Sequence, residues 1–207
     1  MLTWLVATAI AAPNHVLVPV AVGHSVADEY RAFLAKKKLP EASLVCQEVW
    51  QGRTQVCFQV EVKGKRRFVS SADLKSWNMS KSEVWAVVAR SATSKIVEGL
   101  QLHRINGDES RQYWSWVDGT NWPSGGLVVP HEILRVTNLS SVMVALPTKD
   151  TLLVWPAGDE TLNQMMAVGS VEISDANDGL DPSAFRMATE GWQEGLLARP
   201  LSASGSR

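Results

Sequence analysis

The sequence has little cysteine, little histidine and no excess of charge of either sign. Its 207 residues include two cysteines and four histidines, and 20 basic residues stand against 21 acidic ones. Nucleic-acid-binding proteins usually carry a basic face, so the balanced charge argues against that class. The histidines form no metal-binding pair and no glycine-rich phosphate loop is present. We therefore expect no metal site, no cofactor and no nucleic-acid partner. The one basic cluster, at 63–67, is predicted at a solvated hairpin tip, with an anion contact as the alternative.

Long apolar runs are also missing. A membrane-spanning helix needs roughly 20 nearly continuous apolar residues, and the apolar N-terminal segment is interrupted at Pro13, Asn14, His15 and Pro19. The sequence therefore predicts no transmembrane span in the mature chain.

Residues 1–12 have the features of a signal peptide. An apolar run is followed by Ala9-Ile10-Ala11, the small-x-small pattern of a signal-peptidase site. We therefore expect a periplasmic or secreted protein. No Lys or Arg precedes the apolar run, and this leaves an alternative in which the segment is a first buried strand or helix of a cytoplasmic protein.

Cys46 and Cys57 are predicted to face each other across a hairpin. A two-residue turn at Gln51-Gly52 pairs Trp50 with Arg53 and therefore Cys46 with Cys57, on one face and within bridging distance. A four-residue loop would shift the register by two and separate them. In an exported chain a disulfide is expected, whereas in a cytosolic one both cysteines would be small buried hydrophobic residues.

Hydrophobic periodicity and turn residues predict mostly strands with a few helices. Ser80 and Glu83 form a capping box that begins a helix over 80–98, and Gly158-Asp159 begins a helix whose inward residues are Leu162, Met165 and Met166. Other helices are expected over 26–38, over 70–77 and from Pro130. Strands are predicted at 44–50, 55–62, 66–70, 100–105, 111–117, 141–147 and 151–155, with 14–22 a strand or an N-terminal tail, and one strand or helical turn near Phe185. Asn106-Gly107-Asp108 predicts a turn between the strands 100–105 and 111–117.

This order of elements favours an α+β fold with a mostly antiparallel sheet and two or three packed helices. We expect a single domain over 13–198, followed by a disordered Ser/Gly-rich tail over 199–207.

Five segments in order resemble one known family. They are a strand at 58–68 followed by a helix with the pattern Leu74-x-x-Trp77, the capped helix at 80–94, the aromatic strand 113–119 that ends in Asp-Gly, the segment 126–130, and 144–153 with its Val-x-x-Pro-x-x-Asp-x-Leu pattern. Over about 56–191 the chain thereby resembles the YtpQ-like family, known as domain of unknown function 1444. The resemblance implies an α+β domain and, because the family has no established activity, no particular reaction.

Asp118 and Asp150 are the acidic residues that lie both at a strand end and in one of these segments. Paired carboxylates can share acid and base roles when their environments separate their pKa values. The alternative is that each caps a turn, Asp118 before Gly119 and Asp150 after Pro147. Lys149 is expected to pair with one of these acids or to face solvent.

The nine tryptophans are numerous for a chain of this length. Trp114 and Trp116 point to one face of their strand, and with Trp122 in the next loop they could form an aromatic platform for a sugar ring. The alternative is that they fill the space between the sheet and a helix.

No complete catalytic set is present. The sequence therefore favours a non-catalytic binding or accessory protein whose partner is an unidentified protein or envelope ligand. The alternatives are an envelope-acting hydrolase that uses Asp118 and Asp150, or a carbohydrate-binding module built on the tryptophan platform.

Overall fold

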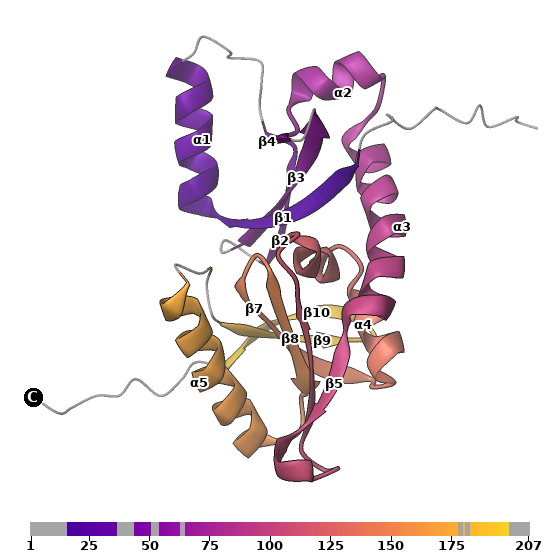
Figure 1. The fold of residues 1–207 in the computed structure, drawn as a ribbon, viewed down its shortest axis with the longest axis vertical. Coiled ribbons are helices and arrows are strands. Elements are labelled where there is room, and N and C mark those ends of the chain that lie inside the picture. Colours follow the sequence, from indigo (N-terminus) through magenta and orange to yellow (C-terminus); the bar gives the residue numbers. More distant parts are fainter. Residues whose placement is uncertain are drawn as a thin grey trace, which may run out of the picture.

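The computed structural model describes residues 16–36, 44–50, 54–62, 65–177, 180 and 183–198. Within them the strands form two antiparallel sheets, of four and six strands, with helices packed on both. The α+β prediction is confirmed, with two sheets where one was expected (Figure 1). The predicted signal peptide at 1–12 and the tail at 199–207 lie outside the described residues.

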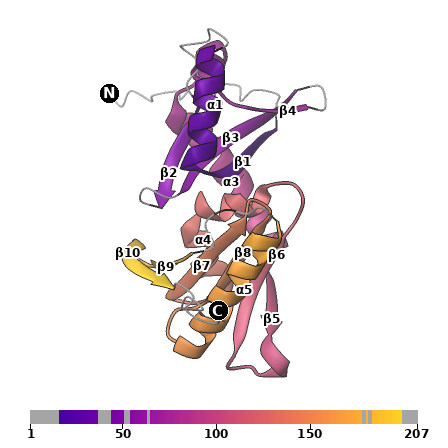
Figure 2. The same ribbon diagram turned by 90° about the vertical axis from the view of Figure 1, so that its left-hand side faces the viewer.

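The N-terminal sheet is built around its third strand. Its elements are β1 (Leu17–Gly23), α1 (His24–Lys36), β2 (Cys46–Trp50), β3 (Thr54–Val62) and β4 (Lys65–Phe68). β1 pairs along one side of β3, whereas β2 and β4 share the other side, β2 with its first half and β4 with its second. α1 lies beside this sheet (Figure 2).

Pro19 lies inside β1, where proline is normally excluded because it has no amide hydrogen. The amide of Ala21 donates to the Ser124 hydroxyl, away from β3. Because amide directions alternate along a strand, the nitrogen of Pro19 also faces away from β3. β1 is an edge strand, so the sheet tolerates the proline.

The C-terminal sheet has the strand order β10-β9-β7-β8-β6-β5. Its strands are β5 (Gln101–Arg104), β6 (Gln112–Val117), β7 (Ser141–Thr148), β8 (Thr151–Pro156), β9 (Ala184–Ala188) and β10 (Gly191–Ala198). The turn predicted at Asn106-Gly107 is confirmed, with φ of 51° and 75° at these residues. The β9–β10 hairpin was not predicted, because only an isolated strand or helical turn was expected near Phe185.

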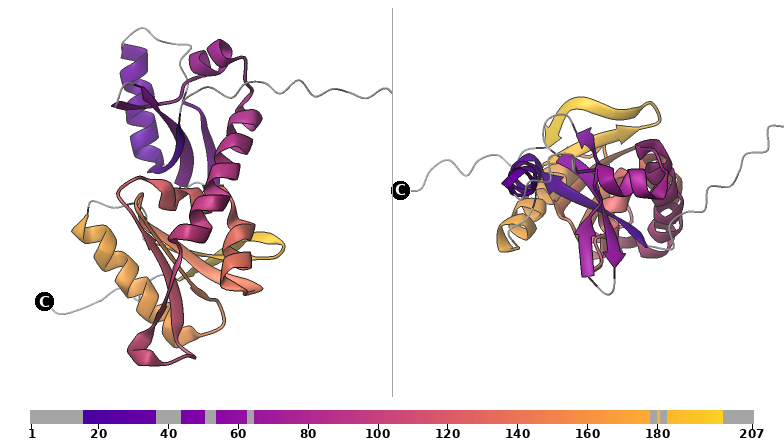
Figure 3. Two further views of the ribbon diagram at one scale, coloured as in Figure 1. Left: turned by 45° about the vertical axis from the view of Figure 1, so that its right-hand side comes forward. Right: turned by 90° about the horizontal axis from the view of Figure 1, so that it is seen from above.

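Two long helices complete the core. α3 (Lys81–Gly99) runs along the molecule past both sheets (Figures 1 and 3), whereas α5 (Glu160–Ala176) lies on the six-stranded sheet (Figure 2). The capping box of α3 is confirmed, with both of its hydrogen bonds. The shorter helices are α2 (Ser71–Trp77), α4 (Pro130–Thr137) and the 3-10 turns η1 (Ile105–Gly107) and η2 (Trp122–Leu127).

The prediction for α5 was wrong at one position. Leu162 and Met166 are buried as predicted, whereas Met165 is 41% exposed. Leu162, Met166 and Ser170 form the i, i+4 row that faces the sheet. Met165 lies at the margin of that row, so its side chain remains largely in solvent.

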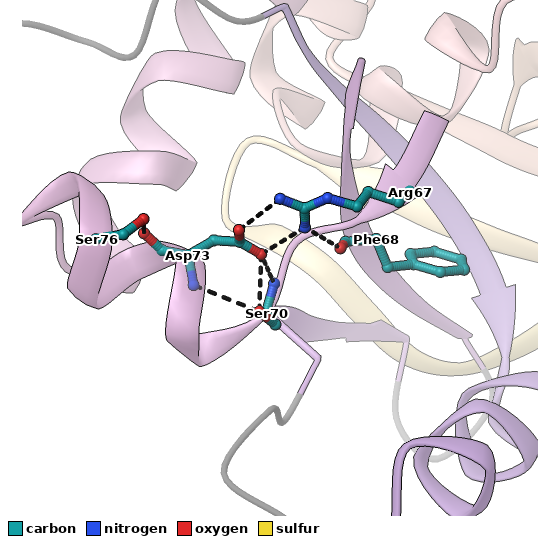
Figure 4. Close-up of polar contacts among 5 residues, drawn as sticks. All are labelled: Arg67, Phe68, Ser70, Asp73 and Ser76. Carbon is teal, nitrogen blue, oxygen red and sulfur yellow. Dashed lines mark hydrogen bonds and ion pairs between the residues drawn. The ribbon is translucent and has the colours of Figure 1, made fainter. Parts of the chain in front are cut away.

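A polar network attaches the start of α2 to β4 (Figure 4). The Asp73 carboxylate accepts two hydrogen bonds from the Arg67 guanidinium, at 2.6 and 2.7 Å, and further bonds from the amide and hydroxyl of Ser70. Burial raises the pKa of Asp73, but the bonds from Arg67 and Ser70 outweigh burial and lower the pKa from 3.8 to about 2. The network therefore stabilises the charged form of Asp73.

The stabilisation from Asp73 should depend on pH. Because its folded pKa is depressed, this contribution is fully present above pH 3.8 and is lost as the pH falls towards 2. We expect Asp73→Asn to lower the free energy of unfolding by about 1–2 kcal/mol near neutral pH, and the difference from wild type to shrink as the pH falls through this window. Urea denaturation at several pH values measures this difference in the free energy of unfolding, with Asp28→Asn on the exposed face of α1 as the control. A difference that does not change with pH would contradict the assignment.

Candidate functional site

The structure brings the two aspartate-bearing turns together. Asp118 follows the end of β6, and Asp150 lies in the turn between β7 and β8. Val117 pairs with Thr151 in the sheet, and beyond this pair the amide of Asp118 donates to the carbonyl of Asp150 at 3.1 Å. The two residues are therefore adjacent in the fold, although 32 positions separate them in the sequence.

Both oxygens of the Asp118 carboxylate accept hydrogen bonds. One oxygen accepts from the Trp116 indole at 2.8 Å. The other accepts from the amide of Thr120 at 2.8 Å and from the Thr120 hydroxyl. Asp118 therefore caps its own turn, in agreement with the capping alternative, and also holds the indole of Trp116.

The carboxylate of Asp150 is engaged on one side. One of its oxygens accepts from the amide of Asn121 at 2.7 Å. Its own turn is capped instead by the hydroxyl of Thr148, which accepts from the amide of Asp150. Asp150 thus stabilises the neighbouring loop, where Asn121 has a left-handed φ of 67°.

The segment that follows, η2, lies between the two sheets. Ser124 is fully buried; its hydroxyl accepts from the amide of Ala21 in β1 and donates to the carbonyl of Lys149 in the β7–β8 turn. The side chain of Asn121 donates to Gln59 in β3. These bonds fix the position of the aspartate-bearing turns relative to the N-terminal sheet.

A cavity of about 570 Å³ lies at this junction. The N-terminal sheet supplies Val20, Ala21, Val22, Gln59 and Phe68. The rest of the lining comes from the strand ends and turns of the C-terminal part, at Val117, Asp118, Gly119, Thr148, Lys149, Asp150, Thr151, Asn177 and Leu180. Asp118, Asp150 and Lys149, which were predicted as site residues, therefore line the cavity.

Sequence reasoning missed the apolar wall of this cavity. Val20, Val22 and Phe68 pack with Cys57 in one cluster on one face of the N-terminal sheet. No local sequence pattern identifies these residues as part of a site, because they lie opposite the aspartates only through contacts between the two sheets.

A disulfide joins Cys46 and Cys57 next to this wall. The predicted pairing of the two cysteines is confirmed, and Val20 pairs with Cys57 on its other side, so the bridge adjoins the lining of the cavity. The prediction for the end of the hairpin was wrong. Trp50 pairs with Thr54 instead of Arg53, because the register shifts after Glu48.

The tryptophan platform is not formed. Trp114 and Trp116 are only 6% and 4% exposed, and both belong to the large core cluster; Trp122 is partly buried and packs against the same cluster. Their face of β6 is covered by the end of α3, where Gly99 lies directly against the Trp116 ring. The indoles fill the core, as the alternative proposed.

The described residues of the basic cluster, Lys65, Arg66 and Arg67, are exposed and form part of the β3–β4 hairpin, in agreement with the predicted solvated hairpin. Residues 63–64 lie outside the described ranges. Arg66 donates to the carbonyl of Thr120 at 3.1 Å and lies 3.7 Å from a carboxylate oxygen of Glu61, and Arg67 pairs with Asp73. Both arginines therefore make contacts within the chain while they remain exposed. Lys149 is exposed, and its side chain has no ion-pair partner among the residues that the structure describes.

Other kinds of site find no support in the described ranges. They contain no group of three or more His, Cys, Asp or Glu side chains that could hold a metal ion. No helix among them has the length and apolar character needed to cross a membrane. Outside the cavity, His103 hydrogen-bonds to Ser115 at 2.8 Å and stacks on Tyr113, which is a cross-strand contact between β5 and β6.

Comparison with known proteins gives no match. No family profile, no curated protein and no solved structure is similar to this chain. A proposal for the function therefore depends on the geometry of the cavity.

Proposed function

We propose that this chain is a non-catalytic binding protein and that the cavity between its two sheets is the ligand site. The observation that carries the proposal is the composition of the cavity. An apolar wall from one sheet faces two aspartates and a lysine from the other. Ligand sites are typically mostly apolar concavities of about 300–1,000 Å³ with a few placed polar groups. The volume and lining of this cavity have that character.

The hydrogen bonds of Asp118 favour binding over hydrolysis. A pair of carboxylates that catalyses hydrolysis needs one group that gives a proton and one that accepts a proton or attacks. Both oxygens of Asp118 already accept hydrogen bonds from Trp116 and Thr120. These bonds hold both oxygens of Asp118 against its own turn and against Trp116. A proton acceptor or nucleophile needs an oxygen that is oriented towards the substrate, so we prefer the binding function to a hydrolase that uses Asp118 and Asp150.

We also propose that the protein is exported and is a relative of the YtpQ-like family. Support for export comes from the Cys46–Cys57 disulfide, since such bonds persist in oxidising compartments. Support for the relationship is the order of the five sequence segments. Mass spectrometry of the intact chain from its native source tests export, because loss of the leader and of two hydrogens at the cysteines both change the mass. A full-length chain with two free thiols would contradict it.

Blocking the cavity should abolish binding without unfolding the protein. Gly119 lines the cavity, its φ is not left-handed, and a Cβ added there would meet no atom within 4 Å. We therefore expect Gly119→Trp to obstruct the cavity while changing stability by less than about 0.5 kcal/mol. A fragment screen followed by amide chemical shifts is expected to show wild-type hits around Val20, Val22 and Thr151, and to show none there in the variant.

Gly158→Trp is the matched control. Gly158 is exposed between β8 and α5, and a Cβ there also meets no atom within 4 Å. Fragment binding should be retained in this variant. Hits that map away from the cavity, or that survive Gly119→Trp unchanged, would reject the proposed site.

A further inference from the structure

We propose that the cavity selects a ligand with an alkylammonium group, that is, a positive charge at the end of an apolar stem. This inference rests on the proposed binding function and names the chemistry of its ligand. The same group occurs in free amines and in lysine side chains of peptides. The charged groups of the cavity differ in how firmly the fold holds them.

The negative charges are held in place. Asp118 is fixed by the Trp116 indole and by Thr120, and Asp150 is fixed by the amide of Asn121. The second oxygen of Asp150 has no hydrogen-bond donor among the described residues, so it can accept one from a ligand. Groups whose geometry is set before binding lose less conformational freedom when the ligand arrives.

The positive charges nearby are either compensated or mobile. Arg66 reaches the carbonyl of Thr120 beside the cavity, but Glu61 lies 3.7 Å from it and offsets its charge. Lys149 lines the cavity on a flexible, exposed side chain. Two fixed carboxylates therefore face one mobile ammonium, and the balance favours a cation.

The wall across the cavity suits an apolar stem. Val20 and Val22 are buried apolar residues, and the Phe68 ring beside them is held edge-on by Tyr30 at a centroid distance of 5.1 Å. A methylene chain buries apolar area against such a wall, and an aromatic face also attracts a nearby cation. The apolar stem of the ligand would thus contact this wall, and its charged end would face the two aspartates.

Two probes with the same stem and opposite charge test the inference. Hexylammonium and hexanoate are titrated into the full chain at pH 7 and followed by amide chemical shifts. We expect hexylammonium to bind about tenfold more tightly than hexanoate.

Asp150→Asn keeps an acceptor for Asn121 and should remove most of this preference. Lys149→Met, which deletes the competing cation, should increase hexylammonium affinity about two- to threefold. Asp108→Asn, on the exposed β5–β6 turn, is the control and should change neither.

The outcomes separate this inference from the proposed function. If hexanoate binds as tightly as hexylammonium, or more tightly, or if Asp150→Asn and Lys149→Met both leave the ratio unchanged, the cation preference is wrong although the cavity binds ligands. If neither probe changes the amide chemical shifts of the cavity residues, although fragments from the screen do change them, the alkylammonium assignment also fails. If nothing binds in the cavity, the proposed function itself fails. A third probe, Nα-acetyl-lysine methylamide, distinguishes the sources: tighter binding than hexylammonium indicates a peptide, and weaker binding indicates a free amine.

Discussion

Replacing Gly99 by alanine is expected to lower the free energy of unfolding by about 2–3 kcal/mol, although the same change inside a helix ordinarily stabilises it. Gly99 is the last residue of α3, and the indole of Trp116 lies directly against it. An added Cβ would lie 2.7 Å from Trp116 Cδ1 and closer still to Nε1 and Cε2. Non-bonded carbon atoms do not approach this closely, so the ring or the helix must move.

The indole has little freedom to move. Trp116 is 4% exposed, and its nitrogen donates to Asp118 at 2.8 Å. Shifting the ring costs this hydrogen bond or disturbs the core around it. The change should therefore also reach the cavity, because Asp118 lines it.

Chemical denaturation measures the free energy of unfolding of Gly99→Ala and of the control variant Gly169→Ala. Gly169 lies within α5, and a Cβ there would meet no atom within 4 Å, so alanine should add about 0.5–1 kcal/mol. Amide shifts of Asp118 and Thr120 should change in the first variant and remain unchanged in the second. Equal stability of the two variants would show that Trp116 is not held against Gly99.

Much of the local structure could be predicted, because its signals involve residues close in sequence. The capping box of Ser80 and Glu83 satisfies amides within one turn of helix, and Asn106-Gly107 accepts the left-handed conformations of a tight turn. The pairing of Cys46 with Cys57 followed from counting residues across a short turn. The extra residue that shifts the hairpin end after Glu48 has no such signal.

The arrangement of these elements could not be predicted in the same way. The alternation along β6 placed Trp114 and Trp116 on one face, but only the position of α3 determines that this face is covered. The division into two sheets depends on contacts between distant segments, such as Ser124 with Ala21. For the same reason the adjacency of Asp118 and Asp150 was a hypothesis, and the apolar wall opposite them was missed.

Removing the disulfide should have the largest effect on stability. We expect the double variant Cys46→Ala/Cys57→Ala to lose about 2–4 kcal/mol, because the bridge closes a short loop in the unfolded chain and restricts its freedom. Cys57 is fully buried between Val20 and the bridge partner. Alanine is chosen because serine would place an unpaired hydroxyl there. Part of the loss therefore comes from packing next to the cavity wall.

The contribution of the covalent bond can be separated from that of packing by adding a reductant. Urea denaturation of wild type with and without dithiothreitol measures the bond, while the double variant measures the bond together with the lost sulfur atoms. Wild type should become less stable on reduction, and the double variant should not respond. An unchanged midpoint for wild type, with reduction verified by mass spectrometry, would contradict a stabilising bridge.

The result also bears on where the protein works. Folded domains have only about 5–15 kcal/mol of stability in total, so losing 2–4 kcal/mol on reduction would be a substantial fraction of it. A chain that depends on the bridge to this extent reaches full stability only where disulfides persist. Loss of stability on reduction would therefore support export independently of the N-terminal sequence. Since Val20 and Val22 pack on Cys57, we expect their amide shifts to change with the oxidation state, which would connect the bridge to the ligand cavity.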